Sequence, residues 1–459
     1  MKTVKQKFVY FAPGIFFIVT ILVLMPGLLN NSWVTVGKKW FVDWRTVKDA
    51  PFVGRLAQSR QAGIFSYAGL LGWGDASYFE DDWEMVVHQY EVYKTSTGFM
   101  ADDFKTYNSA IGFQGMIFSA FERSINIAPE SALLFFQFIT ALLTAILLSL
   151  LALWIYSELG FVAALFAAGF MVISEWITLF GGSIYWSLWA MYLPLVVTAY
   201  FLRKKQFDGD NQHRLALVVY FAILIKSLFN GFEYITTVLI MVFSPLVYYA
   251  LVNRWRLITV TKTCLRVLAA EFLSILTALF ILLVQNAFVF GGIRKAYDYI
   301  VYSLEKRSIG NPTSFANDPA LVESLRASTL IVIKEYILGR AIKLNLAFVS
   351  ARFPDWKLKE LEVSYSTIFI FFLLASVVFF VLQKSGKQGD AKISSFVSVT
   401  WLSVFAPISW FVIFKAHSYL HFHLNFIIWQ MPFVIFGFAM CGAVLQFILN
   451  RLLNEIHLK

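Results

Sequence analysis

The stretch from residue 131 to residue 156 reads SALLFFQFITALLTAILLSLLALWIY and contains no Asp, Glu, Lys or Arg. As an α-helix it would be about 39 Å long, more than the roughly 30 Å of a membrane's hydrocarbon core. The whole chain is 59% hydrophobic and only 14% charged, too few charges to cover a surface in water. These features predict an integral membrane protein.

Nine other apolar stretches have the length of a membrane span. Together with the first they predict an all-α, polytopic helical bundle of about ten transmembrane helices. We expect 1–459 to be a single transmembrane domain, with a first outer loop at 30–130 and a second at 292–364. The ten predicted spans lie near residues 8–29, 131–156, 160–181, 185–202, 214–231, 234–252, 267–291, 365–383, 393–414 and 426–449.

The basic residues predict the orientation. If the N-terminus lies in the cytoplasm, Lys415 is the basic residue of the short outer loops, and the basic residues listed at the end of this paragraph all lie on the cytoplasmic side. This distribution follows the positive-inside rule. The net charge of +10 therefore reflects topology and does not indicate nucleic-acid binding. We expect both termini in the cytoplasm and an uncleaved first anchor. The cytoplasmic basic residues are Lys2, Lys5, Lys7, Arg203, Lys204, Lys205, Arg214, Arg254, Arg256, Lys262, Arg266, Lys384, Lys387, Lys392, Arg451 and Lys459.

The first outer loop holds 12 of the 28 acidic residues. Its segments from Trp83 to Tyr93 and from Ile111 to Phe121 have the spacing of short amphipathic helices lying on the membrane surface. Its densest acidic cluster, at 78–84, reads YFEDDWE. A carboxylate there could act as a general base, or the cluster could cap a helix N-terminus, where negative charge is favoured.

The arrangement of this loop resembles a known superfamily. After the anchor come Asp81-Asp82, Tyr90 and Gly98, then YNSAIGFQG at 107–115, and then a polytopic bundle. The chain looks like a GT-C membrane glycosyltransferase, in which an acidic pair opens a juxtamembrane helix. It departs from that pattern in reading Asp-Asp and in placing the pair about 50 residues beyond the anchor.

The resemblance implies a sugar donor linked to polyprenyl phosphate and a catalytic carboxylate in the loop. Carried over, the role of base falls on Asp82 or Asp81, and Asp43 is a rival because it lies nearer the anchor. The implied reaction moves the sugar, with inversion, to a glycan or lipid acceptor on the non-cytoplasmic face. The implied partners are membrane lipid, the lipid-linked donor and the acceptor.

A second candidate segment, at 415–425, reads KAHSYLHFHLN between the last two predicted spans. His417 and His421 are four residues apart and would share a helix face close to Lys415. This group suits an anion such as a lipid phosphate, although histidines can also bond at the headgroup belt. A divalent metal is possible, but no closed set of ligands is visible, so we predict no metal ligand.

Charged residues also fall within or beside the apolar spans. Because charge in hydrocarbon is costly, Glu175, Lys226 and Glu271 are candidates for a site inside the bundle. Lys226 lies about two turns from Glu233, at an outer helix junction, and the two could instead form an ion pair. Trp186, in another outer turn, offers an aromatic face for a sugar or belongs to an aromatic belt.

The sequence therefore predicts a GT-C-like glycosyltransferase of a bacterial plasma membrane, with its active site on the outer face. Arg294 and Lys295, above the seventh span, are further candidates for binding the donor phosphate. We expect the acidic pair and the histidine segment to share one pocket. A transporter or flippase of a lipid-linked saccharide is the alternative, which should show discontinuous helices and access from both faces.

Overall fold

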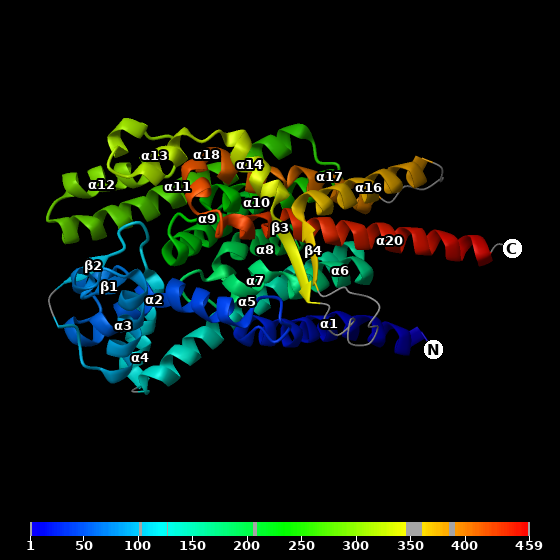
Figure 1. Cartoon of the computed structure of the whole chain (residues 1–459). Helices are drawn as coiled ribbons and strands as arrows, with labels where there is room; N and C mark the ends of the chain where they lie inside the picture. Colours follow the sequence, from blue (N-terminus) through cyan, green and yellow to red (C-terminus); the bar gives the residue numbers. More distant parts are fainter. Residues whose placement is uncertain are drawn as a thin grey trace.

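The computed structural model describes residues 2–100, 103–125, 127–204, 209–345, 360–384 and 391–457. It is an elongated bundle of helices with two short two-stranded sheets. Helix α1 (Lys2–Asn30) begins and α20 (Phe433–His457) ends at the same end of the molecule, which we call the terminal end (Figure 1). The opposite end, with α2 to α4, α12 and α13, is the cap end.

The structure confirms a mainly helical chain with helices suited to a membrane. Among the described residues, eight helical segments are long and apolar enough to cross one. Besides α1 and α20 with its preceding turn, these segments are α5 (Pro129–Leu159), α9 (Gly209–Asn230), α10 (Ile235–Val252), α11 (Leu257–Phe290), α16 (Tyr365–Lys384) and the pair α17 (Ala391–Leu402) and α18 (Phe405–Ile413).

Two of the ten predicted spans take a different form. The stretch at 160–181 forms α6 (Phe161–Ile173) and α7 (Glu175–Gly181), which are bent by 69° and would make a ninth span together. Ser174 lies at the bend, and its side chain accepts a hydrogen bond from Ile177 N, which begins α7. The stretch at 185–202 forms α8 (Leu188–Lys204). With 17 residues α8 is about 26 Å long, shorter than the roughly 30 Å hydrocarbon core.

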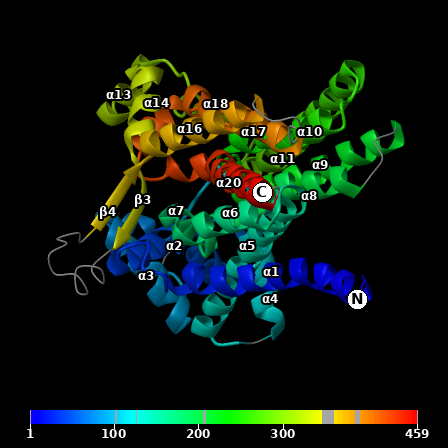
Figure 2. The same ribbon diagram turned by 90° about the vertical axis from the view of Figure 1, so that its right-hand side faces the viewer.

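Helix α20 lies at the centre of the bundle when the molecule is viewed from the terminal end (Figure 2). Small residues let its neighbours approach closely. A Cβ added at Gly442 would lie 2.6 Å from the backbone oxygen of Val162 on α6, and one at Gly437 would meet the Phe372 ring of α16. Small residues are the usual device for close helix packing in membranes, where apolar burial alone gives little drive for association.

We call the described part of the chain between α1 and α5 the cap; its α-helices are α2, α3 and α4, and it also contains a small sheet. Helices α3 (Asp82–Thr95) and α4 (Phe113–Ile125) are the two that the sequence predicted, whereas α2 (Lys38–Ala62) was not predicted. The strands β1 (Gly72–Gly74) and β2 (Phe104–Thr106) pair antiparallel, and β1 packs against α2. A Cβ at Gly54 of α2 would lie 2.3 Å from the backbone oxygen of Gly72, so glycine permits this contact.

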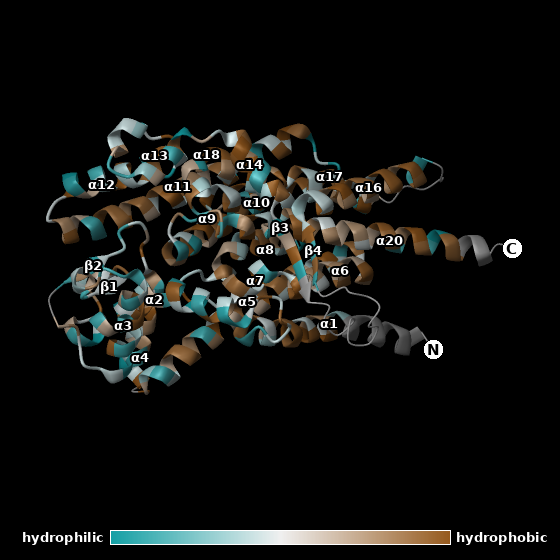
Figure 3. Ribbon diagram, viewed as in Figure 1, coloured by the Kyte–Doolittle hydropathy of each residue, from teal (hydrophilic) through white to brown (hydrophobic). Residues whose placement is uncertain are grey.

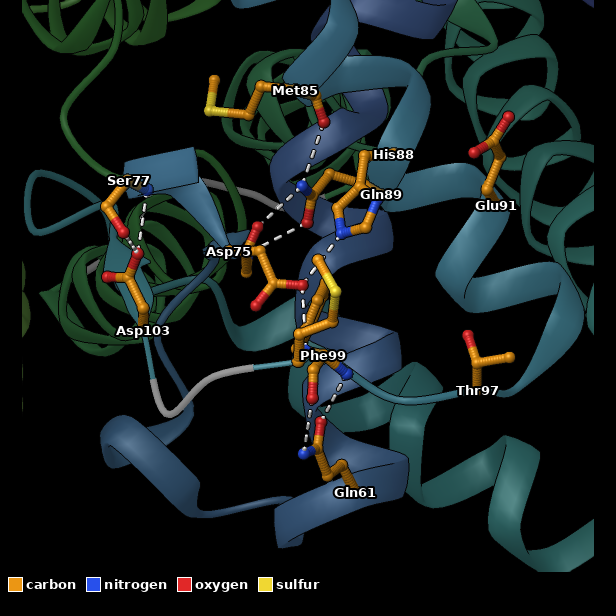
Figure 4. A network of polar contacts seen from close by, with 12 residues as sticks. Gln61, Asp75, Ser77, Met85, His88, Gln89, Glu91, Thr97, Phe99 and Asp103 are labelled. Carbon is orange, nitrogen blue, oxygen red and sulfur yellow. Dashed lines mark hydrogen bonds and ion pairs between the residues drawn. The ribbon is translucent and has the colours of Figure 1, made fainter. Parts of the chain in front are cut away.

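A buried polar network holds the loops of the cap together (Figure 4). The carboxylate of Asp75 is fully buried and lies 2.9 Å from Nε2 of His88 on α3. The same oxygen accepts a hydrogen bond from Met100 N. Gln89 also joins two elements, because its side chain donates to Gly74 O of β1 and to Met85 O of α3. These bonds fix β1 against α3.

The second predicted outer loop is also folded. It contains α12 (Ile293–Glu305), the short 3-10 turn η3 (Pro312–Phe315), α13 (Pro319–Arg326), α14 (Thr329–Leu338) and the hairpin of β3 (Arg340–Asn345) and β4 (Glu360–Ser364). The hairpin was not predicted, and it projects from the side of the bundle (Figure 2). Hydrophilic residues gather in the cap, in α12 and in this hairpin, while the long helices are mainly hydrophobic (Figure 3).

Candidate functional site

A cavity of about 430 Å³ opens where the cap meets the bundle. Its walls come from α2, β1, the turn after β2, the α7–α8 and α9–α10 turns, the segment after α12, α13 and the short helix α19 (Lys415–Leu420). It combines aromatic rings, cations and carboxylates that are far apart in sequence. The lining residues are Val47, Lys48, Pro51, Trp73, Tyr107, Tyr185, Trp186, Glu233, Lys306, Arg307, Asp318, Leu321, His417, Leu420, His421 and Leu424.

The carboxylate of Glu233 is the central acidic group of this cavity. The α9–α10 turn that carries it is tight, with φ of 57° at Gly231 and 53° at Tyr234. The side chain of Lys226, one of the last residues of α9, is fully buried and closes the turn. Its Nζ donates to Gly231 O at 2.9 Å and to Glu233 O at 2.5 Å. Lys226 thus supports the backbone that presents Glu233.

Two side chains from the other outer segments face the Glu233 carboxylate. Nη1 of Arg307 lies 3.6 Å from Oε1, and Nε2 of His417 lies 3.8 Å from Oε2. The backbone joins these two partners, because His417 N donates to Arg307 O at 3.1 Å. Arg307 Nη2 also donates to the hydroxyl of Tyr107 at 3.2 Å. Arg307 therefore connects the cap to the bundle at the carboxylate.

Burial and the permanent charge of Arg307 influence the ionisation of Glu233 and of the nearby histidines. Burial alone would raise the pKa of Glu233, but Arg307 and the other nearby basic groups lower it below its ordinary value. Burial lowers the pKa of His417 to about 3 and that of His421 to about 4, so both imidazoles are neutral near pH 7. Arg307 is then the largest of the positive influences that lower the pKa of Glu233. Burial also lowers the pKa of Lys48, while Glu233 opposes that shift.

Aromatic rings form the wall beside Glu233. Trp186 stacks on Tyr234, with ring centroids 5.6 Å apart and an interplanar angle of 11°. Tyr107 lies between Tyr185, at 6.1 Å, and Trp73, at 6.2 Å, in edge-to-face contacts. Exposed faces and edges of such rings suit the C–H faces of a sugar, since they offer apolar area with polar tips.

Asp49 of α2 fixes this wall from behind and was not singled out from the sequence. It is fully buried, and its Oδ1 accepts hydrogen bonds from Ser183 Oγ at 2.7 Å and Tyr185 N at 3.1 Å. Burial raises its pKa, which these hydrogen bonds partly offset. Because Asp49 binds the backbone of the α7–α8 turn, it sets where Tyr185 meets the cavity.

Four of the residues predicted for substrate binding line the cavity: Trp186, Glu233, His417 and His421. Lys226 lies behind Glu233, as described above. Lys415 faces away, since its Nζ donates to Leu325 O and Ala327 O at 2.9 Å each. Arg294 and Lys295 are exposed at the start of α12 and are not part of the lining.

The three carboxylates predicted as the base are absent from the lining of this cavity. Asp81 is the N-cap of α3, where its side chain accepts from Trp83 N and Glu84 N. Asp82 is exposed in the first turn of α3, and Asp43 is half-buried on α2. The cavity therefore does not unite the acidic pair with the histidine segment, because Asp81 is used as a helix cap instead.

The sequence offered weak signals for the other lining residues. Arg307 and Lys306 were visible only as basic residues of the second outer loop, Tyr107 as the first residue of the 107–115 segment, and Tyr185 as the neighbour of Trp186. Lys48 lies on a helix that was not predicted. Only the packing of the cap on the bundle brings these side chains to Glu233.

The three histidines of the 415–425 segment lie close together. The rings of His417 and His421 lie 4.6 Å apart, and those of His421 and His423 lie 6.1 Å apart, measured between centroids. Within the ranges that the structure describes, no three His, Cys, Asp or Glu side chains are arranged to hold a metal ion. The cavity offers cations and imidazoles, which suit an anion better.

Comparison with known proteins adds no relative. No family model, no curated protein and no solved structure matches this chain. Its function is therefore argued from the cavity itself.

The support that Lys226 gives to Glu233 can be tested by replacement. Lys226→Met should lower the free energy of unfolding by about 1–3 kcal/mol for each buried carbonyl left without a donor. It should also reduce activity, because the Glu233 turn loses its anchor. Thermal unfolding and turnover should be measured together. Normal stability with normal turnover would show that the two hydrogen bonds are dispensable.

Proposed function

We propose that this protein is a membrane glycosyltransferase that moves a sugar from a polyprenyl-phosphate donor to a glycan or lipid acceptor. The observation that supports this best is the cavity around Glu233, where an ionised carboxylate, aromatic rings and several cations converge at the membrane boundary. A phosphate-linked sugar needs all three: rings for the sugar, cations for the phosphate and a base for the incoming hydroxyl.

In this proposal Glu233 is the base, in place of Asp82 or Asp81. Its carboxylate accepts the proton of the acceptor hydroxyl as that oxygen attacks the anomeric carbon. The bond from that carbon to the phosphate oxygen breaks, and its electron pair leaves with the lipid phosphate. Arg307, Lys306 and Lys48 stabilise the departing phosphate. A single displacement of this kind inverts the configuration at the anomeric carbon.

One observation favours the alternative hypothesis, a transporter. Helices α6 and α7 are bent by 69° at a break, and discontinuous helices are common in transporters. The break does not border the cavity. Its charged residue, Glu175, is paired instead with Arg340 of the β3–β4 hairpin, at 3.2 Å.

Contacts near the terminal end favour a bundle that is closed on that side. Glu158, in the last turn of α5, lies 2.9 Å from the Tyr249 hydroxyl of α10 and 3.1 Å from Lys392 Nζ of α17. Arg203 of α8 lies 3.8 Å away. Large side chains fill the bundle below Glu233, including Tyr234 and Trp410, which are almost fully buried. A carrier would have to break these contacts in every cycle, whereas a transferase would not.

The function should be tested on the lipids and glycans of the source cells. Mass spectrometry should show that deletion of the gene removes one sugar from an envelope glycan or lipid and raises the level of its polyprenyl-phosphate donor. The wild-type gene should restore the sugar, and Glu233→Gln should not. Identical lipid and glycan profiles with and without the gene would reject the proposal.

The face of the membrane from which the cavity can be reached distinguishes a transferase from a transporter. In a protein with Cys264 and Cys441 replaced by alanine, a single cysteine at Leu420 should react with an impermeant maleimide only from the non-cytoplasmic face. The reason is that Leu420 lines the cavity, which opens at the cap end. Reaction from both faces, in amounts that change with added lipid-linked sugar, would favour the transporter.

A further inference from the structure

A second hollow lies on the opposite side of α2 from the catalytic cavity. It has a volume of about 970 Å³ and lies between α1, α2 and α5. We call it the α2 groove. Its lining residues are Leu29, Asn30, Asn31, Val34, Lys38, Phe41, Val42, Arg45, Thr46, Tyr90, Leu134, Phe135, Gln137 and Phe138.

The α2 groove lies at the edge of the membrane-spanning region. It takes in the last residues of the α1 span, which ends at Asn30, and the second turn of the α5 span, which begins at Pro129. Leu134, Phe135 and Phe138 of α5 are 66%, 37% and 43% exposed, and they form its apolar side. At this height such side chains face acyl chains, because α5 enters the hydrocarbon here.

The polar side of the groove carries only positive charge. Lys38 and Arg45 belong to its lining, and no Asp or Glu does. The catalytic cavity differs, since Glu233 and Asp318 offset its cations. An anionic headgroup is therefore favoured in the groove by charge.

Arg45 is held in place by the end of α1. Its Nη1 and Nη2 donate to Leu29 O and Leu28 O, at 2.8 and 2.7 Å, at the end of α1. Its Nε is buried and has no hydrogen-bond partner among the described residues. The two bonds to the end of α1 and the Phe41 ring, whose centroid lies 4.5 Å from Cζ, fix the guanidinium charge in the wall of the groove.

We propose that the α2 groove binds an anionic phospholipid from the membrane leaflet at the cap end. The headgroup phosphate lies near Lys38 and Arg45, and the acyl chains follow Leu134, Phe135 and Phe138. The site is separate from the catalytic cavity and does not depend on the proposed glycosyl transfer. Helix α2 borders both sites. Arg45 lines the groove, and Asp49, one turn later, accepts a hydrogen bond from Tyr185 N in the wall of the cavity. Lipid in the groove should therefore stabilise the cavity wall.

Native mass spectrometry of the purified full chain can test this proposal. After delipidation, the protein should be exposed to phosphatidylglycerol or phosphatidylcholine with the same acyl chains. We expect phosphatidylglycerol to be retained preferentially. Lys38→Glu should reduce its retention about tenfold or more, because reversing the charge removes a charge-assisted contact. Leu134→Trp should reduce the retention of either lipid by filling the apolar side.

Matched controls make the test specific. Lys295→Glu reverses an exposed charge at the same end, and Phe272→Trp changes an exposed apolar residue on α11; both should bind lipid as the wild type does. Lys38 is exposed, so Lys38→Glu should fold, which its melting temperature in detergent will show. Equal retention of both lipids, or unchanged retention of phosphatidylglycerol in Lys38→Glu, would overturn the proposal.

Discussion

Glu233→Gln should lower the turnover of the purified protein by about a hundredfold or more, because general base catalysis typically contributes 10²–10⁴. The amide keeps the size of the carboxylate and can still place an oxygen opposite Arg307, which lies 3.6 Å from Oε1 of Glu233, but it cannot take a proton. Donor binding should persist, since the cations and the aromatic wall are unchanged. Turnover and donor affinity should be measured separately with a polyprenyl-phosphate-linked sugar.

The three loop carboxylates provide the matched controls. Asp81→Asn should retain turnover and lose at most about 1 kcal/mol of stability, because asparagine caps a helix nearly as well as aspartate. Asp82→Asn and Asp43→Asn should also retain turnover, since neither side chain lines the cavity. If one of these three is inactive while Glu233→Gln is active, the loop carboxylate suggested by the GT-C resemblance is the base. If all four are active, base catalysis by any of these four carboxylates is excluded.

The membrane spans could be predicted because their signal is local. A stretch such as 131–156 has no charge, and the hydrocarbon core demands that length of apolar helix wherever it occurs. The bend at Ser174 was not predicted, because Glu175 was interpreted as a charge inside one continuous span and not as the first residue of a new helix. Helix α2 was missed because its sequence is not apolar. Its buried Arg55 donates hydrogen bonds to the backbone at Ser66 and Gly63 and to the Ser66 hydroxyl, partners that only the folded chain supplies.

The candidate site could be predicted only in part. Glu233 and His417 stood out because charged and imidazole groups beside apolar spans need a polar environment. Arg307 and Tyr107 did not, since polar and aromatic residues are ordinary in an outer loop. The acidic pair attracted attention by its density, yet Asp81 satisfies backbone N–H groups of its own helix. A dense cluster of acidic residues can contain either a helix N-cap or a catalytic base. The two roles differ in the groups that surround the carboxylate in the folded protein.

Arg307→Gln is expected to reduce kcat/KM by about a hundredfold, because removing one preorganised donor from a developing charge typically costs that much or more. It should also change the dependence on pH. Arg307 is the permanent cation that lowers the pKa of Glu233, and burial acts in the opposite direction. Without Arg307 the pKa of Glu233 should rise.

The direction of the pH effect follows from the role of the base. Glu233 must be ionised to accept a proton, so activity is lost as the pH falls through its pKa. A higher pKa means that the loss begins at a higher pH, and the acidic limb of kcat/KM should move upward in Arg307→Gln. Lys295→Gln, which removes an exposed cation outside the cavity, should leave that limb in place. If Arg307→Gln is slow but keeps the wild-type acidic limb, Arg307 binds only the donor phosphate and Glu233 is not the group whose ionisation limits the rate.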